Sequence, residues 1–116
     1  MERTTTDFES RVEAAWQDPM VWHVIKRLRI DVDRVFTLAD AEDMCEQTRA
    51  LGMLFAARTL DQAKVLHEIF AGAAQRISEI VVEEDDVEMR GALAAHTQKR
   101  ATILDEFIRR SEEKAA

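Results

Sequence analysis

The residues best suited to chemistry in this sequence form a run of acids in its second half. Positions 79–88 hold six carboxylates and no basic residue, and the six are Glu79, Glu83, Glu84, Asp85, Asp86 and Glu88. Carboxylate oxygens bind divalent cations and attract basic protein surfaces. Charge runs are more often solvated, and acids in the first turn of a helix complement its dipole. We therefore interpret the run as a turn between two helices, with an acidic contact surface as its second use.

Two pairs of carboxylates raise an alternative. Asp43 and Glu46 have the spacing D-x-x-E, and Glu83 and Asp86 have the spacing E-x-x-D. Two such pairs on facing helices could hold Mg²⁺, which prefers oxygen ligands. They resemble the carboxylate pairs of the all-α nucleotide pyrophosphohydrolases, although Asp43 stands where that family has Glu and the pairs lie further apart. The resemblance covers these pairs alone and implies a magnesium-dependent nucleotide hydrolase.

The histidines carry two shorter resemblances. His67, followed by Gly72, is similar to the histidine of phosphotransfer domains, and Arg90 with His96 has the R-x-x-x-x-x-H spacing of the HEPN ribonucleases. Gly72 lies one position too far for the first pattern, and Gly91 stands where the second has a polar residue. We interpret His67 as a surface or boundary residue, and we expect no ribonuclease because the chain is acidic.

Composition limits the possible functions. The chain has 116 residues, 47% of them hydrophobic, which suits one domain spanning 1–116 with frayed ends at 1–5 and 112–116. A net charge of −7 disfavours binding to nucleic acid or to an anionic membrane, because both need a dense basic face. The single Cys45 excludes an internal disulfide and a cysteine-based zinc site. We expect no cofactor, and we expect a cytoplasmic protein because no secretory segment is evident.

Helix start signals predict an all-α fold. They lie at Thr6, Asp18-Pro19, Thr37 and Thr59, where capping residues or a first-turn proline occur at the required spacing. A last helix is expected from about Asp86. The region 38–82 is either one long helix or two, because residues 57–62 contain neither Gly nor Pro. The predicted architecture is a helical bundle of four to five helices, whose last two form an antiparallel hairpin folded at 83–86.

Apolar residues spaced three and four apart run along the last two predicted helices. They cover more surface than one neighbouring helix buries, which favours a homo-oligomer. The expected interface comprises Leu66, Phe70, Ile77, Ile80, Leu104 and Ile108. Basic residues near the end of the chain are interspersed with acids, and we interpret them as a mixed-charge solvated face: Lys99, Arg100, Arg109 and Arg110.

Three functions are compatible with these features. The first, which we predict, is a non-enzymatic helical interaction module that acts as a homo-oligomer and binds or sequesters another protein. The second is a small acidic inhibitor, of the type found in phages, that blocks a nucleic-acid-binding complex by presenting carboxylates in place of phosphates. The third is the magnesium-dependent hydrolase. The expected partners are a second copy of the chain and another protein, with no direct binding to nucleic acid or to a membrane.

Overall fold

The computed structural model describes residues 7–52 and 56–115, and within these ranges it is helical and contains no strand. The predicted all-α fold class is therefore confirmed. The helices are α1 (Asp7–Ala15), α2 (Pro19–Asp33), α3 (Leu38–Ala50), α4 (Leu60–Ser78) and α5 (Val87–Ala115), with a single 3₁₀ turn, η1 (Glu84–Asp86), before the last.

The helix starts follow from local capping chemistry. At α2, a carboxylate oxygen of Asp18 accepts a hydrogen bond from the backbone amide of Met20, and Pro19 occupies the first helical position. At α3, the Thr37 hydroxyl accepts from the Asp40 amide at 3.2 Å, while the Asp40 carboxylate accepts from the Thr37 amide at 3.0 Å. Both bonds of the predicted capping box are therefore present.

The start of α4 also has a threonine cap, but its third helical residue is Gln62 where α3 has Asp40, and the second hydrogen bond of the cap differs. The Thr59 hydroxyl accepts from the Gln62 amide as expected, but the Gln62 side-chain oxygen accepts from the amide of Arg58. Its side-chain nitrogen donates to the carbonyl of Ala15 at 3.0 Å, so this cap also ties α4 to the end of α1. The region 38–82 is thus two helices, with α3 ending at Ala50 and α4 beginning at Leu60.

The sequence predicted a helix cap at Thr6 and frayed residues at both ends of the chain. The cap predicted at Thr6, and the fraying predicted for residues 1–5, fall outside the described residues. At the other end, α5 continues as helix through residue 115, and residue 116 lies outside the described residues, so the fraying predicted for 112–116 stays a prediction. An ion pair of 3.5 Å between Lys64 and Glu112 links this last part of α5 to α4.

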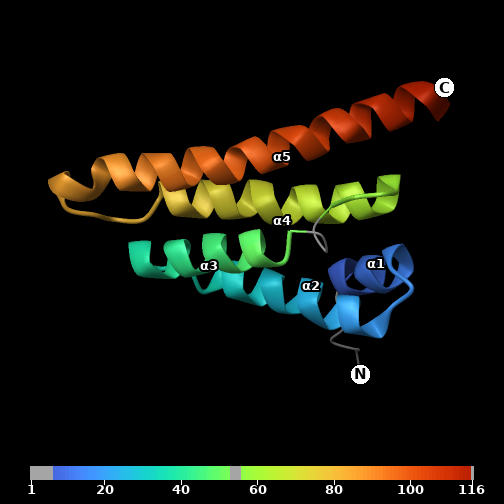
Figure 1. Ribbon diagram of the computed structural model, residues 1–116, viewed down its shortest axis with the longest axis horizontal. Coiled ribbons are helices and arrows are strands. Elements are labelled where there is room, and N and C mark those ends of the chain that lie inside the picture. The colour runs from blue at the N-terminus through green and yellow to red at the C-terminus, as the bar shows by residue number, and fades with distance from the viewer. Residues whose placement is uncertain (1–6, 53–55, 116) are drawn as a thin grey trace.

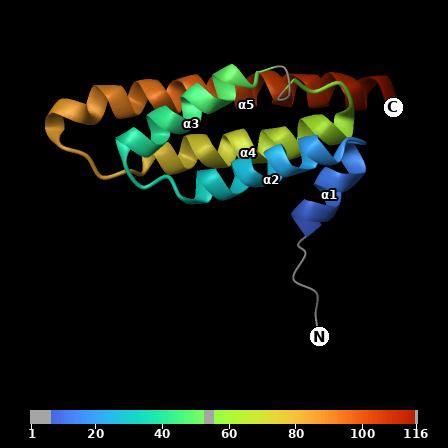
Figure 2. The same ribbon diagram turned by 60° about the horizontal axis from the view of Figure 1, so that its bottom comes forward.

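Helix α4 lies at the centre of the arrangement (Figures 1 and 2). On one side it packs along α5 in the most extensive contact of the molecule, and on the other side it contacts α1 and α2. The colours of Figure 1 show that α4 and α5 run in opposite directions, with the chain reversing through residues 79–86. Helix α3 packs against α5.

The core follows from this central position of α4. A helix with neighbours on several sides must bury more than one stripe, and eight residues of α4 are buried: Ala63, Val65, Leu66, Ile69, Phe70, Ala73, Ala74 and Ile77. By contrast, among residues 87–114 of the longer α5, three are buried: Thr97, Ala101 and Leu104. Most of the surface of α5 therefore stays open. None of the helices in the described part of the chain has both the length and the apolar content needed to cross a membrane.

Candidate functional site

The acidic run lies in the connection between α4 and α5, where the sequence predicted a turn. Glu79 follows the last residue of α4, and Glu84–Asp86 form the single 3₁₀ turn that leads into α5. All six acidic side chains are exposed to solvent. The turn thus presents its carboxylates outward at one end of the bundle, at the left of Figure 1.

Apolar side chains are exposed among these acids. Val81 is 95% exposed, and Val87 and Met89 are 46% and 44% exposed. Val87 and Met89, two positions apart on α5, point to different sides of the helix, so each exposed apolar side chain lies among carboxylates and they do not form one apolar patch. We call residues 79–89 the acidic tip.

Three residues hold the acidic tip in place: Ile80 and Val82 within it and Arg90 directly after it. Ile80 is buried in the core and Val82 packs against it, so the segment is anchored from inside. The guanidinium of Arg90 donates a hydrogen bond of 2.8 Å to the carbonyl of Ile80, which joins the first turns of α5 to the end of α4. Val81 lies between Ile80 and Val82, and its side chain stays exposed to solvent while the backbone on both sides of it is held against the core.

An exposed aromatic residue, Phe36, lies beside the end of α4. Phe36, in the connection between α2 and α3, is 67% exposed. The guanidinium of Arg76 lies 4.9 Å from the centre of its ring and donates to the carbonyl of Val35 at 2.9 Å. Because Arg76 belongs to the last turns of α4, these contacts place Phe36 at the same end of the bundle as the acidic tip.

The two carboxylate pairs of the magnesium alternative do not converge. Asp43 and Glu46 are exposed on α3, while Glu83 and Asp86 are exposed at the acidic tip. Across residues 7–52 and 56–115, no three histidine, cysteine or acidic side chains lie together so that they could hold a metal ion. The arrangement expected from the pyrophosphohydrolase resemblance is therefore absent from the described part of the chain.

The residues expected at an oligomer interface fill the core of the single chain instead. Leu66, Phe70, Ile77, Ile80 and Leu104 are buried, and Ile108 is partly buried against them. Their apolar surface is covered by the chain's own helices, so it is not open to a partner. An interface must use other residues, of which Ile103 on α5, at 58% exposure, is one candidate.

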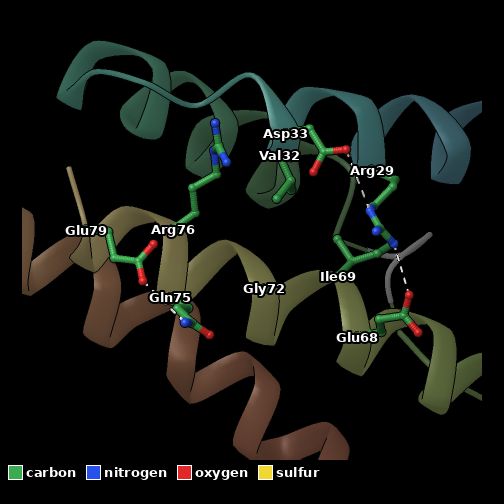
Figure 3. Close-up of a pocket in the computed structure, with 9 residues that line it drawn as sticks. All are labelled: Arg29, Val32, Asp33, Glu68, Ile69, Gly72, Gln75, Arg76 and Glu79. Atoms are coloured by element: carbon green, nitrogen blue, oxygen red, sulfur yellow. Dashed lines mark hydrogen bonds and ion pairs between the residues drawn. The ribbon is translucent and has the colours of Figure 1, made fainter.

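A polar groove between α2 and α4 has a different character (Figure 3). It has a volume of about 340 Å³, and Gly72 leaves it open because nothing lies within 4 Å of where a side chain would begin. Arg29 donates to Glu68 at 2.9 Å and lies 4.0 Å from Asp33. These three charges are paired with one another, whereas Arg76 and Glu79, which also line the groove, bind neutral groups: the Val35 carbonyl and the Gln75 amide.

Glu68 is the centre of a clamp that the sequence did not reveal. Its two carboxylate oxygens accept from Arg11 on α1 at 2.8 Å and from Arg29 on α2 at 2.9 Å. Partial burial alone would raise the pKa of Glu68, but the hydrogen bonds and positive charges of the two arginines lower it overall. The clamp joins residues 57 and 39 positions apart, and no local signal predicts such a pairing.

The histidine motifs do not form the sites that their spacing suggested. The guanidinium of Arg90 is used to bind the carbonyl of Ile80, and His96 is exposed on α5. His67 is partly exposed next to the clamp residue Glu68.

No protein family, no curated protein and no solved structure matches this chain.

Proposed function

We propose that this protein is a non-enzymatic interaction module that binds a basic partner protein through the acidic tip and associates into a homo-oligomer when that partner is absent. The observation that carries the proposal is the presence of Val81, Val87 and Met89, exposed and fixed, among six solvated carboxylates. Apolar side chains contribute affinity when a partner covers them, at about 1.5–3 kcal/mol for a fully buried side chain. The surrounding charges select a partner of opposite sign and speed its approach.

The chemistry of this surface describes the partner. It should present basic side chains around an apolar patch, as an amphipathic basic helix does. A nucleic-acid-binding protein is one class of partner with such a surface, so the inhibitor hypothesis uses the same acidic tip. We expect the interaction to take place in the cytoplasm.

The test begins with a photoreactive amino acid placed at position 81, with position 20 as the matched control. Met20 is 70% exposed at the start of α2 and lies outside the acidic tip. A partner protein should cross-link from position 81 in extracts of the native host and not from position 20. The cross-linked protein is then purified, and its affinity for the unmodified chain is measured.

Charge reversal decides whether the acidic tip is responsible. The variant E83K/E84K/D85K should weaken binding of the purified partner by at least about tenfold, and the remaining binding should depend less on salt. The matched control E42K/D43K/E46K reverses three exposed acids of α3 and should bind as the unmodified chain does. Equal affinity for the tip variant and the control variant would contradict the proposal.

A further inference from the structure

Within residues 7–52 and 56–115, no helix covers the outer side of the C-terminal half of α5, although Gly52, Ala56 and Ala57 line a hollow together with Ile103 and Phe107. Ile103, Phe107, Arg110 and Lys114 recur at intervals of four, three and four, which places them on one side of the helix. Ile103 is 58% exposed, Phe107 is partly exposed, and the two basic residues are exposed. Figure 1 shows α5 at the edge of the molecule, with α4 on one side of it. We call these four residues the basic face.

Positive charge predominates here although the whole chain is acidic. A shallow hollow of about 300 Å³ on the basic face is lined by Ile103, Glu106, Phe107, Arg110, Ser111 and Lys114, which gives two cations and one carboxylate. Within residues 7–52 and 56–115, four basic side chains on or beside this face form no ion pair: Lys99, Arg100, Arg110 and Lys114.

Arg100 lies beside the basic face on the same helix. Its guanidinium lies 4.6 Å from the centre of the buried Phe70 ring, one helical turn before Ile103. Partial burial in these apolar surroundings lowers the pKa of Arg100, because a charged group loses hydration there. The ring of Phe70 compensates for part of that loss, because the face of an aromatic ring attracts a cation.

We propose that the basic face binds the acidic tip of a second copy of this chain. The two surfaces are complementary in both charge and apolar content. Met89 lies on the same side of α5 as Ile103 and Phe107 and would contact them, while the acids around it would face the basic residues. The occupant is the segment of this same chain that displays exposed valines among carboxylates.

The positions of the two surfaces on one helix allow the contact to be reciprocal. The acidic tip adjoins the N-terminus of α5, and the basic face occupies its C-terminal half. With 29 residues, α5 is about 43 Å long, so two copies lying antiparallel bring each tip to the other copy's basic face. A contact repeated in this way closes a two-fold dimer.

This inference rests on the proposed function in one respect, because both use the acidic tip. A second copy and a basic partner protein cannot occupy the same tip together. In the dimer, each acidic tip is covered by the basic face of the other copy. The partner protein and the second copy therefore compete for the tip.

Reversing the charges on each side tests the pairing. The tip variant E83K/E84K and the face variant R110E/K114E change only exposed residues, so helical content and melting temperature should be retained in circular dichroism. In sedimentation velocity over the micromolar range, the unmodified chain should form a dimer. Each variant alone should show a dimer dissociation constant at least about tenfold higher, because like charges then face each other.

Restoration is the decisive result. Mixing the tip variant with the face variant should restore the dimer, because lysines of one chain then face glutamates of the other at one contact, and the native pairing remains at the second contact. Combining all four substitutions in one chain should restore it as well. A monomeric unmodified chain, variants that dimerise as well as the unmodified chain, or a mixture that stays monomeric would each overturn the inference.

The face variant also separates this inference from the proposed function. R110E/K114E leaves the acidic tip intact, so its cross-linking to the partner protein from position 81 should persist or increase once the dimer is lost. Failure of the dimer with partner binding intact overturns only the inference. A dimer that forms without partner binding overturns only the proposed function.

Discussion

Glu68 on α4 accepts a hydrogen bond of 2.9 Å from Arg29 on α2, although the two residues are 39 positions apart. The same carboxylate accepts from Arg11 on α1, so one acid joins the first, second and fourth helices. The salt bridges are partly exposed, and their contribution comes from forming a network more than from any single pair.

Replacing Glu68 by Gln should lower the free energy of unfolding. The Glu68 side chain is 41% exposed, so solvent screening limits the expected loss to about 0.5–1 kcal/mol. Urea unfolding followed by circular dichroism measures it. Glu46→Gln on the exposed surface of α3 is the matched control and should leave stability unchanged. Equal effects for the two variants would show that the clamp does not stabilise the fold.

The clamp should also make stability depend on pH. The two arginines lower the pKa of Glu68 in the folded state, so as the pH falls the unfolded state takes up the proton first. The contribution is therefore complete above the unfolded pKa of about 4.3 and is lost as the pH falls through the lower folded pKa. The stability difference between the unmodified chain and Glu68→Gln should shrink in that range. A difference that stays constant down to strongly acidic pH would contradict the clamp.

The capping box at α3 gives a local prediction. Hydrogen bonds from the amides of Phe36 and Thr37 lower the pKa of Asp40, which shows that its charged form is the one that caps the helix. Asp40→Ala should therefore lower the melting temperature, while Asp43→Ala, one turn further on and without a partner of this kind, should have little effect. The reverse order would mean that α3 does not depend on this cap.

Core and surface residues of α4 and α5 should respond differently to truncation. Ile77 is fully buried, so Ile77→Ala should cost about 2–5 kcal/mol through lost contacts and a cavity. Ile103 is exposed, so Ile103→Ala should change the stability of the dissociated chain by no more than about 0.5 kcal/mol. Urea unfolding at low concentration measures both. Similar losses at the two positions would contradict their placement.

The sequence alone determined the features that depend on neighbours within a few positions. The helix starts at Pro19, Leu38 and Leu60 were predicted, because a cap joins a side chain to an amide two or three residues away. The turn at 83–86 was predicted for a similar reason, since a run of like charges favours solvent wherever the rest of the chain packs.

Only the tertiary structure decided what covers each apolar face. The spacing of Leu66, Phe70 and Ile77 indicates that one side of α4 is buried, and it is equally compatible with burial by a second copy or by the same chain. The structure places α4 between α5 and the first two helices, which buries these residues internally. The clamp at Glu68 and the exposure of Val81 depend on the same arrangement, because both result from contacts between segments that the sequence keeps far apart.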